Sequence, residues 1–572
     1  MHKIDIVILI IYLIGLVGMG SVFSRMKNTK EMFSAGGKSP WWLSGLSSFM
    51  TTFSAGTFVV WGGIAYRHGM VGVSILVVIG VAAMFAGKFM AGVWKKMGYQ
   101  SAPEFLNDRF GKSLVRFYIF LQGLVGVFTM GGAVYALAVV VTALIPMEVG
   151  HILADPETGT FSVTIASLII CALVILITFG GGLWAVLVTD ALQFIILSAS
   201  VLIVVPLIIL KVGGPVSFIE RVPDGFLRLT NDDFSVYFLI GWSVVFFFKI
   251  GGEWAYVQRY ICVPTSNDAK KSAYLFGILY IMSPLFWMLP PMAYSLIDPN
   301  ADHEKAYILA SQAVLPAGML GLMIAAMCSA TASMATTQLN VFAGAFTTEL
   351  YQRVINPDAT DSQMVYVGRF ITLALGLIVI AGALLIPLMG TYTGYILASV
   401  AILTGPMVLP TIWGLFSKKI TTKAAWYVTI VSIFVGLVVK VGFQNDGFLT
   451  SVSYLSGLAE LIINNERVTD IVVGTVFPVL MLLAFELMSK QVDPGWLEVA
   501  KVKEKYVEGE PEEASLLPAK LCAWSSIIVG GLMFIIAIIN SENRMLMLLF
   551  SVFLCMIGFL ILKYQTNKLK NI

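Results

Sequence analysis

Three charged residues, Asp190, Lys249 and Glu253, lie inside stretches of sequence that are otherwise strongly apolar. A charged side chain at the centre of a lipid bilayer costs about 2.5–3.5 kcal/mol on insertion scales, so such residues usually serve a function. Lys249 and Glu253 are four residues apart and would share one face of a helix, where they bind a ligand or simply neutralise each other. These three residues are the first candidates for a binding site.

A second candidate is a run of hydroxyl side chains between residues 328 and 340. Ser333, Thr336 and Thr337 stand at positions i, i+3 and i+4, so their oxygen atoms converge on one helix face. A hard cation prefers several such oxygen ligands. The alternative is that each hydroxyl bonds to a carbonyl of its own helix, as is common in membrane helices. Taken alone, the residues slightly favour this second explanation.

Two apolar stretches are interrupted by residues that form helix poorly. Residues 47–57 are rich in hydroxyls and small side chains, and residues 249–253 hold a double glycine between two charges. Interruptions at matching positions of two repeats point to the substrate site of a transporter. The alternative is that small residues only allow close helix packing. We expect solute-binding residues at these interruptions, namely Thr52, Ser54, Thr57, Lys249, Glu253 and Trp254.

The composition places these residues in a polytopic membrane protein. Of 572 residues, 58% are hydrophobic and 12% charged, against about 45–50% and about 25% in soluble domains. This excludes a soluble enzyme and a disordered chain, and the net charge of +3 is too small for a nucleic-acid binder. The five cysteines lack CxxC spacing, and we find no HExxH cluster or Walker-type loop. We therefore expect no disulfide framework, zinc site or ATP-driven pump.

The elements that must position the candidate residues are membrane-spanning helices of about 20 apolar residues each. Fifteen segments qualify: 4–24, 41–65, 69–93, 117–145, 161–180, 187–211, 236–257, 273–295, 316–343, 366–390, 393–416, 424–443, 468–488, 521–539 and 545–563. Basic residues gather in alternate loops, and Arg109 and Arg259 are counted among these loop charges. Because basic loops face the cytoplasm, we expect the N-terminus outside and the C-terminus inside.

The interrupted segments open two blocks of five predicted helices that start on opposite sides of the membrane, which is the geometry of an inverted repeat. We expect the following division of the chain: an extra N-terminal helix in 1–24, the first repeat in 41–211, the second repeat in 236–416, additional transmembrane helices in 424–488, a cytoplasmic linker in 489–520, and a C-terminal transmembrane hairpin and tail in 521–572.

Five motifs follow one another along the chain. They are Glu31–Lys38 followed by Trp41–Trp42, Pro103–Phe105 with Arg109–Gly111, the Gly-Gly-Leu-Trp-Ala run that leads to Gln193, Val257–Arg259, and Gly414–Lys419. Together they resemble the sodium/solute symporter family, which includes sodium/glucose, sodium/proline and sodium/sialic-acid carriers. The resemblance covers residues 5–440. It implies an all-α polytopic membrane protein with the leucine-transporter-type 5+5 inverted repeat, one extra N-terminal helix and about four extra C-terminal helices.

The resemblance also implies one or two sodium ions. The first sodium site would lie between the first and eighth core helices and would use the carbonyls of Met50, Phe53 and Ala330 with the hydroxyl of Ser333. Relatives carry a second hydroxyl directly after this serine. The chain has Met334 there, whose thioether is a poor sodium ligand.

A second sodium site, known in some relatives, is matched better. It would be formed by Asp190, Ser333, Thr336 and Thr337. The carboxylate of Asp190 would compensate the charge of the ion, which explains an acidic residue at this depth. Hydroxyl groups that only bond to their own helix do not explain a carboxylate opposite them, so the resemblance favours a cation here.

The function implied is a sodium-coupled secondary active symporter that imports a small organic solute by alternating access, without enzyme activity. Relatives that carry sugars bind them with glutamine and glutamate where this chain has Thr57 and Leu76. Lys249, at a position that is aromatic in relatives, would pair with a carboxylate and favours an anionic solute such as a sugar acid. The alternative is a neutral sugar or polyol, if Glu253 already neutralises Lys249.

A solute-gated channel and a transporter-like sensor are further alternatives. We expect the protein in the plasma membrane, or in the inner membrane of a Gram-negative bacterium. Its expected partners are the solute, sodium and the lipid bilayer, with no nucleic acid and no obligatory protein partner.

Overall fold

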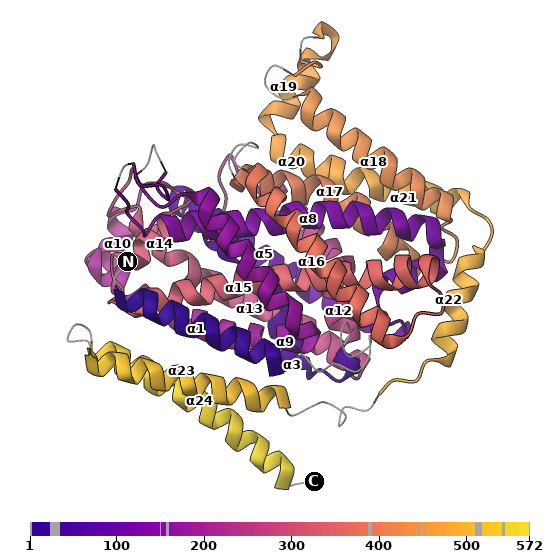
Figure 1. Cartoon of the computed structure of the whole chain (residues 1–572). Coiled ribbons are helices and arrows are strands. Elements are labelled where there is room, and N and C mark those ends of the chain that lie inside the picture. Colours follow the sequence, from indigo (N-terminus) through magenta and orange to yellow (C-terminus); the bar gives the residue numbers. More distant parts are fainter. Residues whose placement is uncertain are drawn as a thin grey trace.

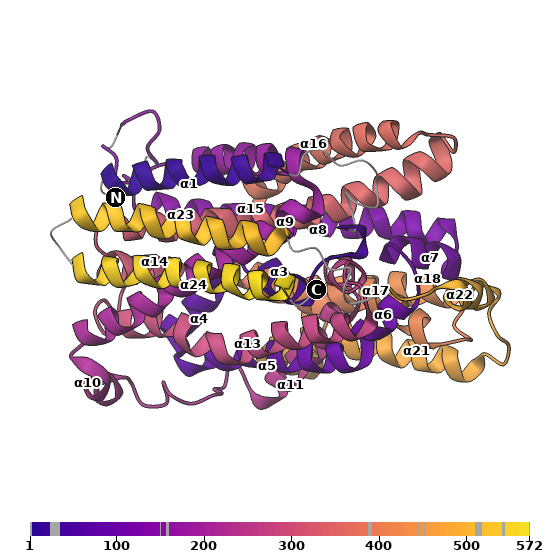
Figure 2. The ribbon, with the colours of Figure 1, turned by 90° about the horizontal axis from the view of Figure 1, so that it is seen from below.

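The computed structural model describes residues 3–22, 35–148, 150–155, 159–386, 392–443, 447–450, 452–509, 517–539 and 544–570. Residues 25–34, which belong to an expected basic loop from Arg25 to Lys38 and include the start of the first motif, lie outside these residues. Most helices run lengthwise in Figure 1, with α10 (Gly214–Arg221) and α14 (Ala306–Gln312) at one end and α22 (Pro494–Lys505) at the other. Figure 2 shows the same two ends from below. We call them the α10 end and the α22 end.

The first part of the chain ends in one very long helix. Its elements are α1 (Lys3–Val22), η1 (Ala35–Gly37), α3 (Trp41–Thr51), η2 (Thr57–Trp61), α4 (Gly62–His68), α5 (Met70–Ala86), η3 (Gly87–Ala91), α6 (Gly92–Lys96), α7 (Ala102–Phe110), α8 (Lys112–Thr142) and α9 (Val163–Lys211). The sequence predicts two separate spans within α9, whereas the backbone stays helical through residues 181–186. Glycines in this segment weaken a helix by only about 1 kcal/mol each, which is not enough to break it.

The second part contains a bent pair of helices, α11 and α12. Its elements are α11 (Val236–Gly252), α12 (Trp254–Ile261), α13 (Ser266–Tyr294), α15 (Met319–Ala345), η4 (Phe346–Ile355), α16 (Asp361–Leu385), α17 (Tyr392–Phe416), α18 (Thr422–Gly442), η6 (Ser453–Leu455), α19 (Ser456–Asn464), α20 (Glu466–Ile471), η7 (Val472–Val476), α21 (Phe477–Met488), α23 (Leu517–Ile539) and α24 (Arg544–Lys570).

Ten helices in the described residues are long and apolar enough to cross a membrane, or eleven if α11 and α12 form one bent span. As far as the structure describes them, the fifteen predicted segments fall on helices, and the number of crossings stays a prediction. The chain is thus an all-helical bundle built for a membrane.

The helix α15 lies at the centre of this bundle, and all of its residues are buried. Asp5 on α1 holds its first turn, because the Asp5 carboxylate accepts hydrogen bonds from the backbone N–H groups of Gly318 (2.6 Å) and Gly321 (2.9 Å). A Cβ on Gly321 would lie 2.4 Å from the backbone of Asp5, so only glycine allows this approach. The hydroxyl-rich segment of α15 is therefore fixed inside the protein.

The first predicted interruption is confirmed as a break between α3 and η2. Backbone N–H groups at this break donate to side-chain oxygens instead of to helix carbonyls. The N–H of Ser54 donates to the hydroxyl of Thr57 (3.2 Å), that of Gly56 to Ser54 (3.1 Å), and that of Ala55 to Thr331 on α15 (2.9 Å). The hydroxyls in this stretch thus replace the hydrogen bonds that an unbroken helix would make.

The second predicted interruption is also confirmed, because α11 and α12 meet at an angle of 53°. Carbonyls at the end of α11 accept hydrogen bonds from the Trp94 indole (to Gly251, 2.7 Å) and the Tyr260 hydroxyl (to Ile250, 3.1 Å). A Cβ on Gly251 would lie 1.9 Å from the sulfur of Met90. The double glycine therefore serves both the break and the close packing that we considered as its alternative.

A buried arginine ties together the α22 end. The side chain of Arg109 on α7 is 0% exposed, and its Nη1 lies 2.7 Å from Oδ1 of Asp493, which precedes α22. Its Nη2 donates to the carbonyls of Ser417 (3.1 Å) and Ile420 (2.8 Å), which follow α17. Arg109, counted among the loop charges, is therefore a buried residue whose guanidinium donates to a carboxylate and to backbone carbonyls.

Candidate functional site

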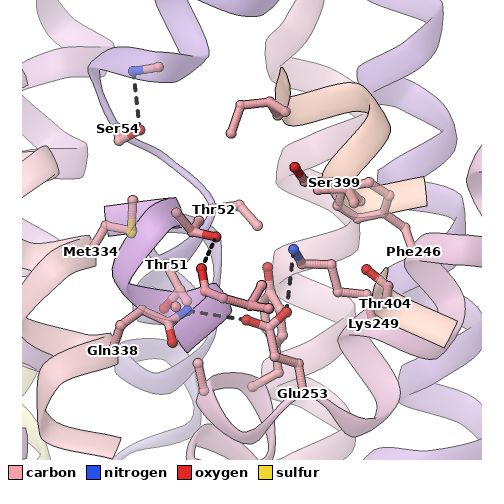
Figure 3. A pocket seen from close by; sticks show the side chains of 18 of the residues that line it. Thr51, Thr52, Ser54, Phe246, Lys249, Glu253, Met334, Gln338, Ser399 and Thr404 are labelled. Carbon is pink, nitrogen blue, oxygen red and sulfur yellow. Dashed lines mark hydrogen bonds and ion pairs between the residues drawn. The ribbon is translucent and has the colours of Figure 1, made fainter. Parts of the chain in front are cut away.

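A central cavity of about 160 Å³ lies between the two helix breaks, α8, α15 and α17 (Figure 3). All six residues predicted to bind solute line it. They come from the break after α3 (Thr52, Ser54), from η2 (Thr57), from α11 (Lys249) and from its junction with α12 (Glu253, Trp254). Two breaks that are about 200 residues apart in sequence therefore face one space.

Lys249 and Glu253 form an ion pair inside this cavity. Lys249 Nζ lies 3.4 Å from Glu253 Oε2, and the two side chains are 18% and 23% exposed. Glu253 Oε1 also accepts a hydrogen bond from the amide of Gln338 on α15, at 3.1 Å. Both charges suit their helices, since Lys249 is in the last turn of α11 and Glu253 precedes the first turn of α12. Figure 3 shows the two side chains meeting in the open space.

Sequence reasoning missed much of the cavity wall. Further polar residues come from α8 (Gln122, Thr129), α11 (Trp242), α15 (Gln338) and α17 (Ser399, Thr404). Gln122 and Thr129 are seven residues apart in an apolar span, a spacing that puts both on one helix face and was the available signal. Met334 also lines the cavity. The Met334 side chain therefore borders the central cavity.

The four atoms expected at the first sodium site belong to buried residues where α3 ends against α15. The Met50 carbonyl accepts the N–H of Phe53 at 3.0 Å, and the neighbouring hydrogen bond from Ala55 to Thr331 joins the two helices. The Ser333 hydroxyl donates to Asp190. The serine shared by both expected sodium sites is thus turned towards the second one.

The expected second sodium site is a buried cluster. Asp190 is 1% exposed, and its two carboxylate oxygens accept hydrogen bonds from Ser333 and from Ser47 on α3. Thr337 is 1% exposed and accepts a hydrogen bond from Arg259 at 2.9 Å. Thr336 is buried on the same helix. Three elements, α3, α9 and α15, therefore converge on the carboxylate.

Arg259 on α12 is the member of this cluster that sequence reasoning assigned wrongly. It is not a loop charge but is 0% exposed, with Nε and Nη2 at 3.2 and 3.1 Å from the Ser47 hydroxyl. Its Nη1 donates to the side chain of Gln258 at 2.8 Å. The positive charge is kept inside because Asp190 lies on the other side of Ser47. The Val257–Arg259 motif, valued only as a family marker, was the signal for it.

Comparison with known proteins decides the family. The model of the sodium:solute symporter family matches residues 32–432. The chain belongs to this family. It is 28% identical over 498 residues to the sodium/glucose cotransporter of Vibrio parahaemolyticus, covering 76% of this chain and 85% of that protein. It is 26% identical to the sodium/myo-inositol cotransporter 2 of Rattus norvegicus over 77% of this chain and 70% of that protein.

A sodium/sialic acid symporter of Aliivibrio fischeri, NanT, is 26% identical and matches over 67% of this chain and 77% of its own length. Among solved structures, a Na⁺-coupled sialic acid symporter in a substrate-bound outward-open state superposes with a TM-score of 0.65 at 22% identity, covering 84% of this chain and 98% of that one. Mhp1, a nucleobase-cation-symport-1 family transporter, superposes with a TM-score of 0.50 at 14% identity, covering 84% and 97%.

These likenesses identify a symporter of the leucine-transporter-type fold and not an enzyme. The chain is a multi-pass membrane protein of a family that carries a small solute together with sodium.

Proposed function

We propose that this protein imports a sugar acid or a similar small carboxylate together with sodium. The α22 end faces the cytoplasm and the α10 end faces outwards, with the N-terminus outside and the C-terminus inside, in the plasma membrane. The alternation of basic loops along the sequence supports this orientation. The inverted repeats are residues 41–211 and 236–416, each opened by one of the two breaks.

Sodium binds at one or two places beside the solute. The first site is formed by the carbonyls of Met50, Phe53 and Ala330 with the Ser333 hydroxyl. The second is formed by Asp190, Ser333, Thr336 and Thr337. Support for the second comes from the convergence of Ser333 and Ser47 on a buried carboxylate, since oxygen atoms around a negative charge suit a hard cation.

Sodium that binds from outside joins α3 to α15 and completes the solute cavity at the breaks. The loaded protein then closes outside and opens inside, as in other transporters built from inverted repeats. The membrane potential contributes about 2.3 kcal/mol per charge for each 100 mV, so an inward sodium gradient can concentrate the solute.

Lys249 carries the proposal of an anionic solute. Its ammonium group borders the central cavity, and an ammonium has three N–H donors, so the contact with Glu253 leaves donors for a ligand. Glu253 in turn receives an N–H from Gln338 and keeps a partner when Lys249 turns to a solute carboxylate. A charge-assisted contact of this kind is among the stronger hydrogen bonds.

The second candidate is a neutral sugar or polyol. The Lys249–Glu253 ion pair at 3.4 Å favours it, because the two charges balance and leave a neutral cavity lined by hydroxyl and amide groups. Relatives that carry glucose and myo-inositol agree with this candidate, and the sialic acid symporters agree with the first.

Uptake into proteoliposomes tests the function. With an inward sodium gradient, we expect accumulation of D-glucuronate above equilibrium, which collapses when sodium is the same on both sides. Flux that never exceeds equilibrium would instead indicate a channel. Competition by D-gluconate, D-glucose and myo-inositol then ranks acids against neutral solutes.

The variant Lys249→Met distinguishes the two solute classes. We expect about tenfold weaker competition by acids and less than a twofold change for neutral sugars, since about 1.4 kcal/mol of charge-assisted bonding is lost. Lys88→Met is the matched control, because Lys88 is an exposed lysine outside the cavity. Equal loss for acids and neutral sugars would rule out pairing of Lys249 with a carboxylate.

A further inference from the structure

A second cavity of about 210 Å³ lies on the α22 side of the central cavity, between α7, α12, α15 and η4. Trp254 lines both cavities and therefore lies between them. The second cavity is similar in volume to the central one. Nothing described so far uses this space.

Two buried hydrogen-bond donors among its lining residues lack a partner. The indole N–H of Trp254 and the side-chain amide N–H of Asn340 make no hydrogen bond within the part of the chain that the structure describes, although the residues are only 2% and 4% exposed. Buried donors are nearly always paired in folded proteins, because an unpaired donor loses its hydration without compensation. Two such donors beside one cavity point to a ligand that accepts hydrogen bonds.

The same cavity offers acceptors. Glu104 on α7 and Glu349 on η4 both line it, and Glu349 is 4% exposed with its carboxylate 3.3 Å from Arg353. Two carboxylates with one nearby guanidinium leave an excess of negative charge. A cavity with both donors and acceptors matches a molecule with several hydroxyl groups, since each hydroxyl donates one hydrogen bond and accepts others.

We propose that the second cavity is a distinct binding site for the transported polyhydroxylated solute, which it occupies after passing Trp254 and before release. Solute oxygens accept from Trp254 and Asn340, and solute hydroxyls donate to Glu104 and Glu349. This proposal rests on the proposed function, because it takes its ligand from there. The negative charge makes the site weaker for a sugar acid than the central cavity with Lys249, and a weak last site speeds release.

Solute placed inside proteoliposomes tests the second site. Uptake of D-glucuronate and D-glucose is first measured with no solute inside, and the external concentration at half-maximal rate reports the central cavity. Solute is then added inside, and the internal concentration that halves the uptake reports the site nearest the release side. For Asn340→Leu, which removes the donor at similar size, we expect at least a threefold rise in the internal value and less than a twofold change in the external one. Thr348→Val is the matched control, since Thr348 lines the same cavity but its hydroxyl already donates to Gly344.

A variant that binds internal D-glucuronate more tightly provides a test that misfolding cannot mimic, because a misfolded protein does not gain affinity. Glu349→Gln removes negative charge, so we expect internal D-glucuronate to inhibit at a concentration at least threefold lower, with internal D-glucose nearly unchanged. Equal shifts on both sides in Asn340→Leu, or no internal shift in either variant, would overturn the second site while leaving symport intact. If the wild type accumulates neither D-glucuronate nor D-glucose with sodium, both the proposed function and this site are refuted.

Discussion

Two pairs of opposite charges lie within the bundle, and their surroundings differ. Asp190 and Arg259 are 1% and 0% exposed and share the Ser47 hydroxyl, with further oxygens from Ser333 and Thr337. The side chains of Lys249 and Glu253 are 18% and 23% exposed and face a cavity. The first pair has its hydrogen bonds made by the protein, whereas the second keeps room for a ligand. On the proposed function, we therefore expect the first pair to set structure and ion coupling and the second to set solute choice.

The largest expected effect comes from removing one partner of the fully buried pair, Asp190 and Arg259. Arg259→Met leaves the Asp190 carboxylate buried without compensation, and we expect a loss of about 3–5 kcal/mol in the free energy of unfolding, with no uptake. Thermal unfolding in detergent measures this loss. The double variant Asp190→Asn with Arg259→Met should regain most of the stability without uptake. A single variant as stable as the wild type would show that the two charges do not depend on each other.

The next effect concerns ion coupling, measured on protein that still folds, because Asp190→Asn also leaves the buried Arg259 guanidinium without its counter-charge. Asp190→Asn keeps the shape and the acceptor oxygen but removes the charge, so we expect at least a tenfold rise in the sodium concentration for half-maximal uptake. Asp361→Asn, a carboxylate exposed at the start of α16, is the control and should change nothing. An unchanged sodium requirement in Asp190→Asn would remove Asp190 from the sodium site.

A smaller effect is expected at the pair that faces the cavity, Lys249 and Glu253. Gln338→Leu deletes the hydrogen bond to Glu253 and frees this carboxylate to hold Lys249 more closely. Because one such bond contributes about 1 kcal/mol, we expect a threefold to tenfold rise in the half-saturating solute concentration with an unchanged sodium requirement. A change in the sodium requirement of similar size would mean that the two pairs are not separate in function.

The smallest effect is expected at a contact near the surface, between Arg67 and His303. Arg67 Nη2 lies 2.9 Å from His303 Nδ1 near the α10 end. Burial, and then the Arg67 guanidinium, lowers the pKa of His303 from its ordinary value of 6.5. The neutral form is thus favoured in the folded protein, so its contribution is complete above pH 6.5 and declines as the pH falls below that value.

Because this contact is half exposed, the loss should be less than about 1 kcal/mol. Unfolding midpoints at pH 7.5 and 5.5, compared with those of His303→Gln, isolate it. A pH-dependent difference as large as that of Arg259→Met would contradict the ranking by exposure.

The two breaks were predictable from the sequence because their causes are local. A double glycine between Lys249 and Glu253, or a run of hydroxyls from residue 47 to 57, disfavours continuous helix whatever surrounds it. Much of the cavity wall was not predictable in this way. Gln122 and Ser399 have apolar neighbours in the sequence, and only the packing of α8 and α17 beside the breaks brings them to the cavity.

The buried arginines were missed for a different reason. Arg109 and Arg259 lie between predicted spans, where a basic residue normally meets water and lipid head groups. Their acceptors come from segments distant in the sequence, such as Asp493 for Arg109 and Ser47 for Arg259. The rule that assigns orientation from basic residues in loops cannot predict such long-range pairings.

The contact between Arg109 and Asp493 can form only late in synthesis of the chain. Its partners are 384 residues apart, so a ribosome adding 5–20 residues per second needs about 20–80 s to make the second after the first. Throughout that interval the guanidinium lacks the carboxylate that neutralises it. A nascent chain that stops before residue 493 therefore keeps an uncompensated cation in a half-built protein, a recognisable mark of incomplete synthesis.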